Sequence, residues 1–380
     1  MSDHQHDHDH PDLPEEVQAE LERLAECLGQ LHDPATGLAL DELDAEIEVG
    51  FDDGTVFVGI TLGYPCGSLE ENWRERVHQA CLPLLKGGAL GDSALQFELF
   101  SEIPATPAGD APEPLQGVKN IVAVASGKGG VGKSTTAVNL ALALAAEGAS
   151  VGLLDADIYG PSLPTMLGTE GARPQVREQK FFVPVAAQGL ETMSLGYLMT
   201  EDTPAVWRGP MASGALNQIL TQTLWGELDY LIVDMPPGTG DIQLTLAQKA
   251  TLAGAVIVTT PQDLALKDAI KGVEMFRKVS VPVLGIVENM ALHTCSNCGH
   301  SEPIFGSGGG ERIAADYDTR LLGQLPLAMA IREGTDRGLP SVAAEPDGEI
   351  AGCYREIARR AAAQIWLNAG EEGLPEIEIR

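Results

Sequence analysis

The chain has 380 residues, 44% of them hydrophobic, and its 55 acidic and 24 basic residues give a formal net charge of −31. A chain of this length is expected to form two domains around a large core, while so negative a field disfavours binding to nucleic acid or to anionic membranes. No apolar run reaches membrane-spanning length and no apolar signal core opens the chain, so we expect a cytoplasmic protein.

The first part of the chain is predicted to be a disordered His/Asp-rich tail, residues 1–13, followed by a small α+β domain, residues 14–103. The domain's expected elements are helices over 13–31 and 69–85 and strands over 45–49, 56–62 and 94–100, with the turn sequence Asp52-Asp53-Gly54 joining the first two strands. This order resembles the small iron–sulfur assembly domain that often precedes one type of ATPase, and Cys66 stands where that family places a cysteine. A buried structural thiol is the alternative for Cys66.

A linker and a larger domain are predicted next. Residues 104–117 are rich in proline, alanine and glycine, which is typical of an extended linker. From 118 to 370, apolar strands alternate with helical patterns, which predicts an α/β domain with a doubly wound, mainly parallel sheet. Its expected strands are 120–125, 151–155, 230–234, 254–259, 281–288 and 321–325, and 180–195 is expected to be an inserted β-hairpin.

The segment GKGGVGKS, residues 127–134, is a phosphate-binding loop between the expected strand 120–125 and an Ala/Leu-rich helix. The order of strand, loop and helix disfavours a chance match. Loop N–H groups and the helix N-terminus would bind phosphate, Lys133 would reach the β- and γ-phosphates, and the Ser134 hydroxyl would complete a Mg²⁺ shell. The candidate nucleotide-binding residues here are Gly127, Lys128, Gly129, Gly130, Val131, Gly132, Lys133, Ser134 and Thr135.

The additional lysine of this loop, Lys128, narrows the class of ATPase. The sequence GKGGVGKST resembles the deviant Walker A loop of the ParA, MinD and nitrogenase iron-protein ATPases. In those families the early lysine crosses a dimer interface to the partner's nucleotide, so the resemblance implies a homodimer that encloses ATP and a catalytic role for Lys128. A solvated loop lysine is the alternative.

Three acidic residues follow apolar strands at the edge where parallel sheets bind their ligands. Asp155 ends the strand 151–155 and Asp157 follows it, while Asp234 ends 230–234 in a Walker B pattern whose carboxylate holds Mg²⁺. The resemblance to MinD-like ATPases implies that Asp157 positions the attacking water. A helix N-cap role before Pro161-Ser162 is the alternative, and it suits Asp155 better than it suits both.

Other segments resemble the Mrp/ApbC/Nbp group of ATPases. DMPPGTGD, residues 234–241, resembles their second switch, and in related ATPases an asparagine like Asn289 reads adenine, although a buried, internally bonded amide is an equal alternative. Many members carry an acidic residue where this chain has Ala328, which leaves the backbone of Pro326 as the candidate contact to ribose or base. The resemblance covers residues 118–367 through DADIYGPS, VWRGPM, DMPPGTGD, VENM, CSNCGH and LGQLPL…IREGTDRG.

The pair Cys295 and Cys298 forms a C-x-x-C motif, which suits a metal or a cluster and, as a rival, a redox disulfide. One chain offers two thiolates here whereas a [4Fe–4S] cluster generally takes four, and a two-fold dimer supplies two plus two. The Mrp/ApbC/Nbp resemblance implies that arrangement. A zinc site that adds His293 and His300 is the alternative within one chain.

Together these features predict an ATP-hydrolysing carrier that holds a labile [4Fe–4S] cluster between two subunits and transfers it to apoproteins. The expected partners are a second copy of the chain, apo iron–sulfur proteins and cluster-assembly proteins. The expected cofactors are ATP and Mg²⁺. The alternatives are a partitioning or positioning ATPase of the ParA/MinD type, which needs a DNA- or membrane-docking surface, and a zinc-stabilised scaffold ATPase.

Overall fold

The computed structural model describes residues 13–371 except 108–114, 200–208, 239, 241–242, 244–245, 247–249 and 296. The chain divides into two compact units, Met1–Glu102 and Ile103–Arg380. None of the helices in the described ranges is both long and apolar enough to cross a membrane.

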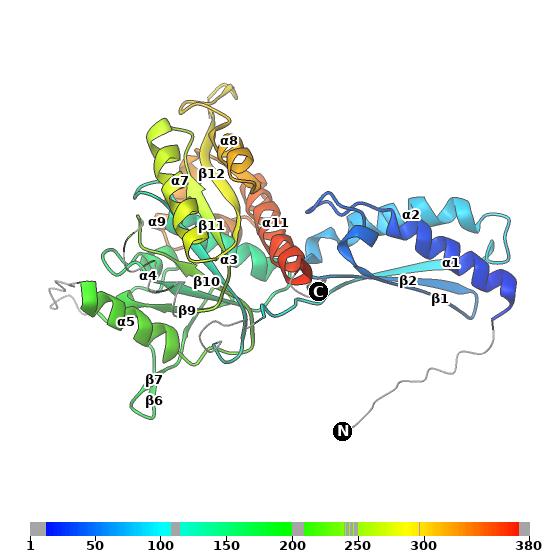
Figure 1. The fold of residues 1–380 in the computed structure, drawn as a ribbon, viewed down its shortest axis with the longest axis horizontal. Coiled ribbons are helices and arrows are strands. Elements are labelled where there is room, and N and C mark those ends of the chain that lie inside the picture. Colours follow the sequence, from blue (N-terminus) through cyan, green and yellow to red (C-terminus); the bar gives the residue numbers. More distant parts are fainter. Residues whose placement is uncertain are drawn as a thin grey trace, which may run out of the picture. The chain divides into compact units, whose positions relative to one another are not determined.

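The small unit is a three-stranded sheet in the order β1-β2-β3 with helices on one face (Figure 1). The first two strands are antiparallel, and the second and third are parallel. Asp53 and Gly54 adopt left-handed backbone conformations in the turn between the first two strands, as a tight hairpin requires. The elements are α1 (Glu15–Gly29), β1 (Glu46–Asp52), β2 (Thr55–Leu62), α2 (Glu70–Leu85) and β3 (Ala94–Ser101).

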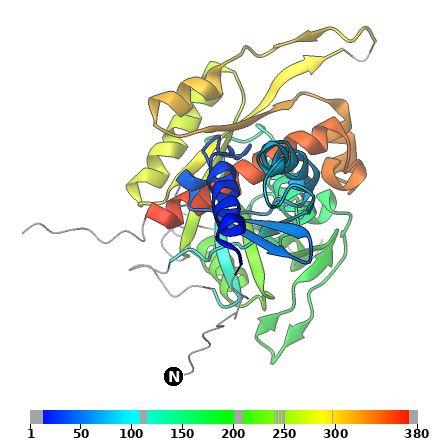
Figure 2. The same cartoon turned by 90° about the vertical axis from the view of Figure 1, so that its right-hand side faces the viewer.

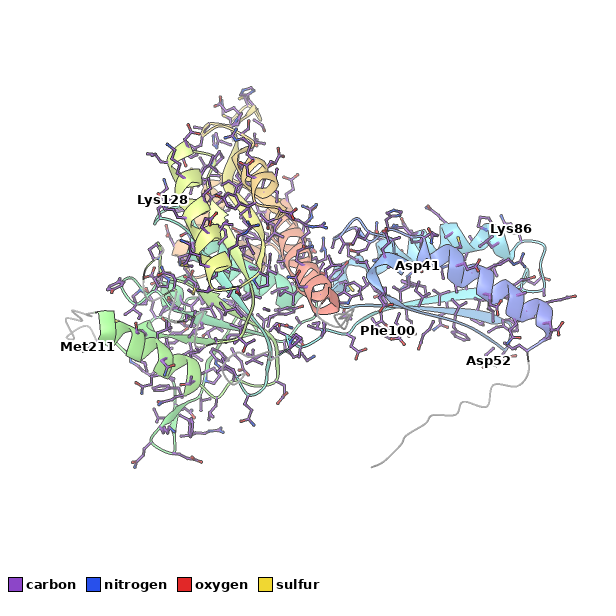
Figure 3. The ribbon with its side chains drawn as sticks, in the orientation of Figure 1. Asp41, Asp52, Lys86, Phe100, Lys128 and Met211 are labelled. Atoms are coloured by element: carbon purple, nitrogen blue, oxygen red, sulfur yellow. The ribbon has the colours of Figure 1, made fainter. Side chains whose placement is uncertain are left out.

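Alternation along β2 separates the two faces of this small sheet. Val56, Val58 and Ile60 are buried, whereas Phe57 between them is 40% exposed. Phe100 of β3 likewise points away from the helices (Figure 3). Cys66 is buried, and its sulfur lies 3.2 Å from Ser101 Oγ, which agrees with the structural alternative for this thiol.

The large unit is built on a nine-stranded sheet, with strand order β13-β12-β11-β4-β10-β5-β9-β8 and β14 paired to β12. The central strands are parallel, while β8 and β13 pair antiparallel to their neighbours. The predicted α/β fold with a mainly parallel sheet is confirmed. Its strands are β4 (Val118–Ala125), β5 (Val151–Asp155), β8 (Val185–Ala187), β9 (Leu190–Ser194), β10 (Leu228–Asp234), β11 (Leu252–Thr259), β12 (Val283–Thr294), β13 (Ser301–Glu302) and β14 (Leu321–Pro326), and a separate two-stranded ribbon is formed by β6 (Val176–Arg177) and β7 (Phe181–Phe182).

Helices cover both faces of this sheet. Its strands are apolar at successive residues, so apolar side chains point to both faces and both must be buried. Ile121 and Ala123 of β4 share one core cluster with residues of α7 and α8, whereas α3 packs with α11 outside that cluster. Both groups of helices flank the sheet in Figure 1. The helices are α3 (Lys133–Ala146), α4 (Leu163–Met166), α5 (Gly209–Thr221), α7 (Asp263–Lys278), α8 (Gly309–Asp316), α9 (Met329–Asp336), α10 (Ser341–Ala344) and α11 (Glu349–Glu371).

Two predicted elements differ from the structure. The strand expected at 281–288 continues to Thr294 as β12, because β14 and β13 provide backbone partners beyond the apolar run. The segment 180–195 does contain the expected hairpin, in which β8 pairs antiparallel to β9, but this hairpin is part of the main sheet because β9 pairs parallel to β5. The start of the predicted linker is also bound to the large unit, since Asn120 Nδ2 donates to Pro104 O at 2.8 Å.

Candidate nucleotide site and cysteine hairpin

The phosphate-binding loop joins β4 to α3 at the middle of the sheet. β4 pairs with β10 on one side and β11 on the other, so the loop lies where open α/β sheets bind their ligands. Gly130 and Gly132 have φ values of 84° and 86°, a region that glycine adopts without strain. A Cβ atom at Gly132 would lie 2.1 Å from Asn289 Nδ2, so a side chain at this position would displace the Asn289 amide.

Lys133 and Asp234 form a buried ion pair beside this loop. Their side chains are 6% and 3% exposed, and the Lys133 ammonium also donates to Ser134 Oγ at 3.2 Å. Burial raises the pKa of Asp234 above its ordinary value, and the Lys133 ammonium opposes that rise. The structure therefore brings together the predicted phosphate-binding lysine and the two predicted Mg²⁺ ligands.

Asp155 is a hydrogen-bond acceptor at the end of the neighbouring strand β5. Its carboxylate accepts from the backbone N–H groups of Asp157 (3.0 Å), Ser162 (3.1 Å) and Leu163 (3.2 Å), and from Ser194 Oγ (3.0 Å). Burial, and then the nearby Asp234 carboxylate, raise its pKa to about 7. These bonds agree with the capping alternative for Asp155, which holds the loop that carries Asp157.

Asp157 is half-buried and lies close enough to Asp234 for its charge to raise that residue's pKa further. The loop after Asp234 is bonded to β4 by the N–H of Met235, which donates to Val124 O at 3.0 Å, and to the residue that follows β4 by the N–H of Gly238, which donates to Ser126 O at 2.9 Å. Thr239 and Asp241 of this predicted switch lie outside the described residues, as do residues 206–208 of the VWRGPM segment.

Lys128 lies at the outer side of the large unit beside α7 (Figure 3). Ser126 Oγ donates to its carbonyl oxygen at 2.9 Å, which fixes the loop backbone at this residue. The Asp268 carboxylate faces it: a hydrogen bond from Lys271 lowers the pKa of Asp268, and the Lys128 charge adds to the effect. The structure thus separates Lys128 from the buried Lys133–Asp234 pair.

Asn289 is 8% exposed and reaches the phosphate-binding loop from β12. Its Nδ2 donates to Val131 O at 2.9 Å, and its Oδ1 accepts from the N–H of Met290 at 2.9 Å. This is the internally bonded amide that the sequence left as an alternative to adenine recognition. Pro326 is half-buried at the end of β14, where it pairs with Leu292 of β12.

The C-x-x-C motif occupies the tip of a hairpin formed by β12 and β13, which extends away from the rest of the large unit (Figures 1 and 2). The tip is closed by the Cys295 N–H, which donates to His300 O, and by the Gly299 N–H, which donates to Cys295 O, both at 2.9 Å. Cys295 is half-buried and Cys298 is exposed. Hydrogen bonds from the backbone N–H groups of Asn297 and Cys298 hold the pKa of the Cys295 thiol below its ordinary value.

The two histidines flanking the motif do not join the cysteines in a cluster. Within the described part of the chain, no three His, Cys, Asp or Glu side chains gather in a way that could hold a metal ion. His293 instead places Nδ1 3.2 Å from Leu327 O. One chain therefore presents a pair of thiols at an accessible tip.

The sequence of the large unit matches the family model described as "ParA: NUBPL iron-transfer P-loop NTPase" over residues 117–362. The chain belongs to this family. It is 52% identical over 357 residues to the iron-sulfur cluster carrier protein of Escherichia coli strain K12, covering 94% of this chain and 95% of that protein. It is 51% identical over 255 residues to the iron-sulfur cluster transfer protein NUBPL of Mus musculus, covering 67% of this chain and 80% of that protein.

Among solved structures, this NUBPL-family chain resembles the nucleotide-binding protein of Archaeoglobus fulgidus in complex with ADP. The identity is 39% and the TM-score 0.52, over 58% of this chain and 87% of that one. The family predicted from the deviant Walker A loop and the C-x-x-C motif is confirmed, as is the P-loop NTPase fold.

Sequence reasoning missed two side chains that organise the site of this family member. Ser194, at the end of β9, binds Asp155, and Gln243 binds the loop after Asp234. Ser194 had no signal, because its strand was expected to lie outside the main sheet. A signal for Gln243 was present in Pro236-Pro237, since two prolines leave carbonyl groups that need donors from elsewhere.

Proposed function

We propose that this chain is an ATP-binding and ATP-hydrolysing iron–sulfur cluster carrier that works as a homodimer in the cytoplasm. The cargo would be a labile [4Fe–4S] cluster held by Cys295 and Cys298 of two subunits and delivered to apo iron–sulfur proteins. The observation that carries the proposal is the accessible thiol pair at the tip of β12, a strand whose Asn289 also contacts the phosphate-binding loop. The Escherichia coli carrier protein named above, which aligns over 94% of this chain, supports it.

The residues around the phosphate-binding loop fit Mg²⁺ and a nucleoside triphosphate. Ser134 Oγ and the Asp234 carboxylate are hard oxygen donors, and both already contact the Lys133 ammonium, so cation and metal ligands converge at the N-terminus of α3. Mg²⁺ would neutralise charge on the phosphates. Lys133 would bind the β- and γ-phosphate oxygens, and Asp157 would orient the attacking water from the loop that Asp155 holds.

The homodimer follows from the chemistry of the two half-sites. Two thiols from each of two chains complete the four ligands that a [4Fe–4S] cluster generally takes, and a two-fold axis brings identical tips together. Apolar side chains lie in and next to the hairpin: Leu292 of β12 and Ile304 after β13 are 43% and 52% exposed. Burying such residues against a second copy would stabilise the pairing. Lys128 would then reach the partner's nucleotide from its outer position.

The test is anaerobic reconstitution with iron and sulfide. Wild-type protein should gain about two iron and about two sulfide per chain and elute as a dimer, because one cluster is shared by two chains. Cys295→Ser and Cys298→Ser should each abolish the gain without loss of folding. Cys353→Ser, which removes a half-buried thiol of α11, is the matched control and should load normally. Full loading of the Cys295→Ser, Cys298→Ser double variant would contradict the proposal.

A further inference from the structure

Gln243 is a buried side chain directed at the loop that follows Asp234. It is 3% exposed. Its amide nitrogen lies 2.9 Å from Pro236 O, 3.3 Å from Pro237 O and 3.1 Å from Gly238 O. Three consecutive carbonyl groups therefore converge on one amide group, whose two hydrogens are shared among them.

The loop depends on this amide because of its sequence. Pro236 and Pro237 have no N–H group, so they cannot tie the loop to its surroundings by donating. The loop is held at its ends instead, where the N–H of Met235 donates to Val124 O at 3.0 Å and that of Gly238 donates to Ser126 O at 2.9 Å. Between these anchors the carbonyl groups need a donor, since buried carbonyls are rarely left unpaired.

The position of the loop matters for chemistry because of what lies at its two ends. Asp234, the proposed Mg²⁺ ligand, comes directly before it, and the Gly238 N–H is bonded to Ser126, one residue before the phosphate-binding loop begins. A shift of the loop would move the Asp234 carboxylate and the glycine backbone relative to the phosphates. Misplacement of a catalytic group by about 1 Å can lower the rate of the catalysed reaction about a hundredfold.

We propose that Gln243 is a positioning residue for ATP hydrolysis, which fixes the Pro236–Gly238 loop through its three carbonyl groups. This inference rests on the proposed ATPase function and goes beyond it by assigning a role to a residue outside the nucleotide-binding motifs. Gln243 acts through the loop, while the phosphates are bound by Lys133 and the residues before it. Removing the amide should therefore lower kcat and leave nucleotide affinity nearly unchanged.

The variants separate the amide from the volume of the side chain. Gln243→Leu is close in size and cannot donate, and Gln243→Glu places a carboxylate against three carbonyl oxygens. Each should lower kcat at least about tenfold, with the Kd for a non-hydrolysable ATP analogue within about threefold of wild type. Gln243→Asn keeps the amide on a shorter stem and should retain an intermediate kcat.

The matched control is Asn120→Leu. Asn120 is also a fully buried amide whose Nδ2 donates to backbone carbonyls, those of Pro104 (2.8 Å) and Asp229 (3.1 Å), but it lies at the opposite end of β4 from the phosphate-binding loop. Its loss should lower stability while kcat stays within about threefold of wild type. An equal loss of kcat in Asn120→Leu would show that general destabilisation explains the effect and would overturn the proposal.

Hydrogen exchange gives a reading that does not depend on hydrolysis. The Gly238 amide should exchange faster in Gln243→Leu than in wild type or Asn120→Leu, because the loop loses its hydrogen bonds to the Gln243 amide. Wild-type kcat with wild-type exchange in Gln243→Leu would refute the inference, as would an affinity that falls as far as kcat. Should the wild-type chain hydrolyse no ATP, the proposed function fails, while the exchange comparison still decides whether Gln243 holds the loop.

Discussion

Lys133→Met is expected to destabilise the large unit to an extent that grows with pH. The substitution keeps an unbranched apolar stem and removes the ammonium that contacts Asp234 in a buried setting. Asp234 then stays buried without its cation and with the Asp155 carboxylate nearby. Breaking a buried ion pair by removing one partner typically costs about 3–5 kcal/mol, because the remaining charge is uncompensated.

The folded protein can limit this cost by protonating Asp234. Relative to the ordinary carboxyl pKa of 3.8, protonation costs about 1.4 kcal/mol for each pH unit above that value. Protonation therefore limits the destabilisation to about 1.6 kcal/mol at pH 5. At pH 8 the limit is about 5.7 kcal/mol, which exceeds the cost of the uncompensated charge, so the full destabilisation should be observed. The sign follows from linkage: the variant's folded state holds a proton that the unfolded state has released, so its stability falls as pH rises.

Urea unfolding at pH 5, 6.5 and 8 measures the effect, with calorimetry to separate the transitions of the two units. The Lys133→Met, Asp234→Asn double variant is the control, because it removes both charges and should recover most of the lost stability at pH 8. Both variants should lack ATPase activity, so the stability difference is independent of catalysis. A pH-independent loss, or no recovery in the double variant, would refute the buried-pair reasoning.

Three further outcomes are expected. Asp157→Ala should bind an ATP analogue normally and hydrolyse ATP at least about tenfold more slowly, and an equal loss of binding in calorimetric titration would make Asp157 a metal or structural residue. Lys128→Ala should bind nucleotide yet fail to form the ATP-dependent dimer by light scattering; normal dimers and turnover would leave it a solvated lysine. Asp155→Asn removes a carboxyl whose pKa is raised to about 7, so wild-type stability relative to this variant should fall between about pH 4 and pH 7, and a flat difference would contradict its burial as the cause.

The positions of the candidate nucleotide-site residues were largely predictable because the signals for them are local. An apolar run that ends in a carboxylate, as at Asp234, predicts both a buried strand and the edge of the sheet where ligands bind. The glycines and Lys133 of the phosphate-binding loop likewise depend on neighbours in sequence. The pairing of Lys133 with Asp234 spans 101 residues, and only the parallel register of β4 and β10 brings them together.

The rest of the site depends on contacts that leave no local pattern. The apolar run of β12 stops before Glu288, yet the strand continues because β14 and then β13 supply backbone partners. Met290 adopts a left-handed conformation with φ 58° where the pairing with β14 shifts, an irregularity that side-chain pattern does not encode. The expected strand therefore stopped at residue 288, and the hairpin that presents the cysteines was not predicted.

The long strand β12 gives a physical route by which the two proposed sites could influence each other. Asn289 joins it to the phosphate-binding loop at Val131, and Cys295 follows six residues later, a span of about 20 Å for extended chain. A movement of the loop at Val131 would therefore be transmitted, through the hydrogen bond to Asn289, to the strand that leads to Cys295. Coupling of this kind is reciprocal, so cluster loading should change nucleotide affinity by the same factor as nucleotide changes cluster affinity.

Asn289→Ala should break this coupling and leave both ends functional. With wild-type protein, a saturating ATP analogue should change the rate of cluster loss to a chelator by about fivefold or more relative to ADP, because ligands that couple typically do so by 1–3 kcal/mol. With Asn289→Ala the two rates should converge while iron loading stays normal. Gln324→Leu is the matched control: its amide donates to Glu288 on the same strand at 2.8 Å and not to the phosphate-binding loop, so coupling should persist. Undiminished coupling in Asn289→Ala would show that the signal bypasses β12, and equal rates in wild type would show that the two sites act independently.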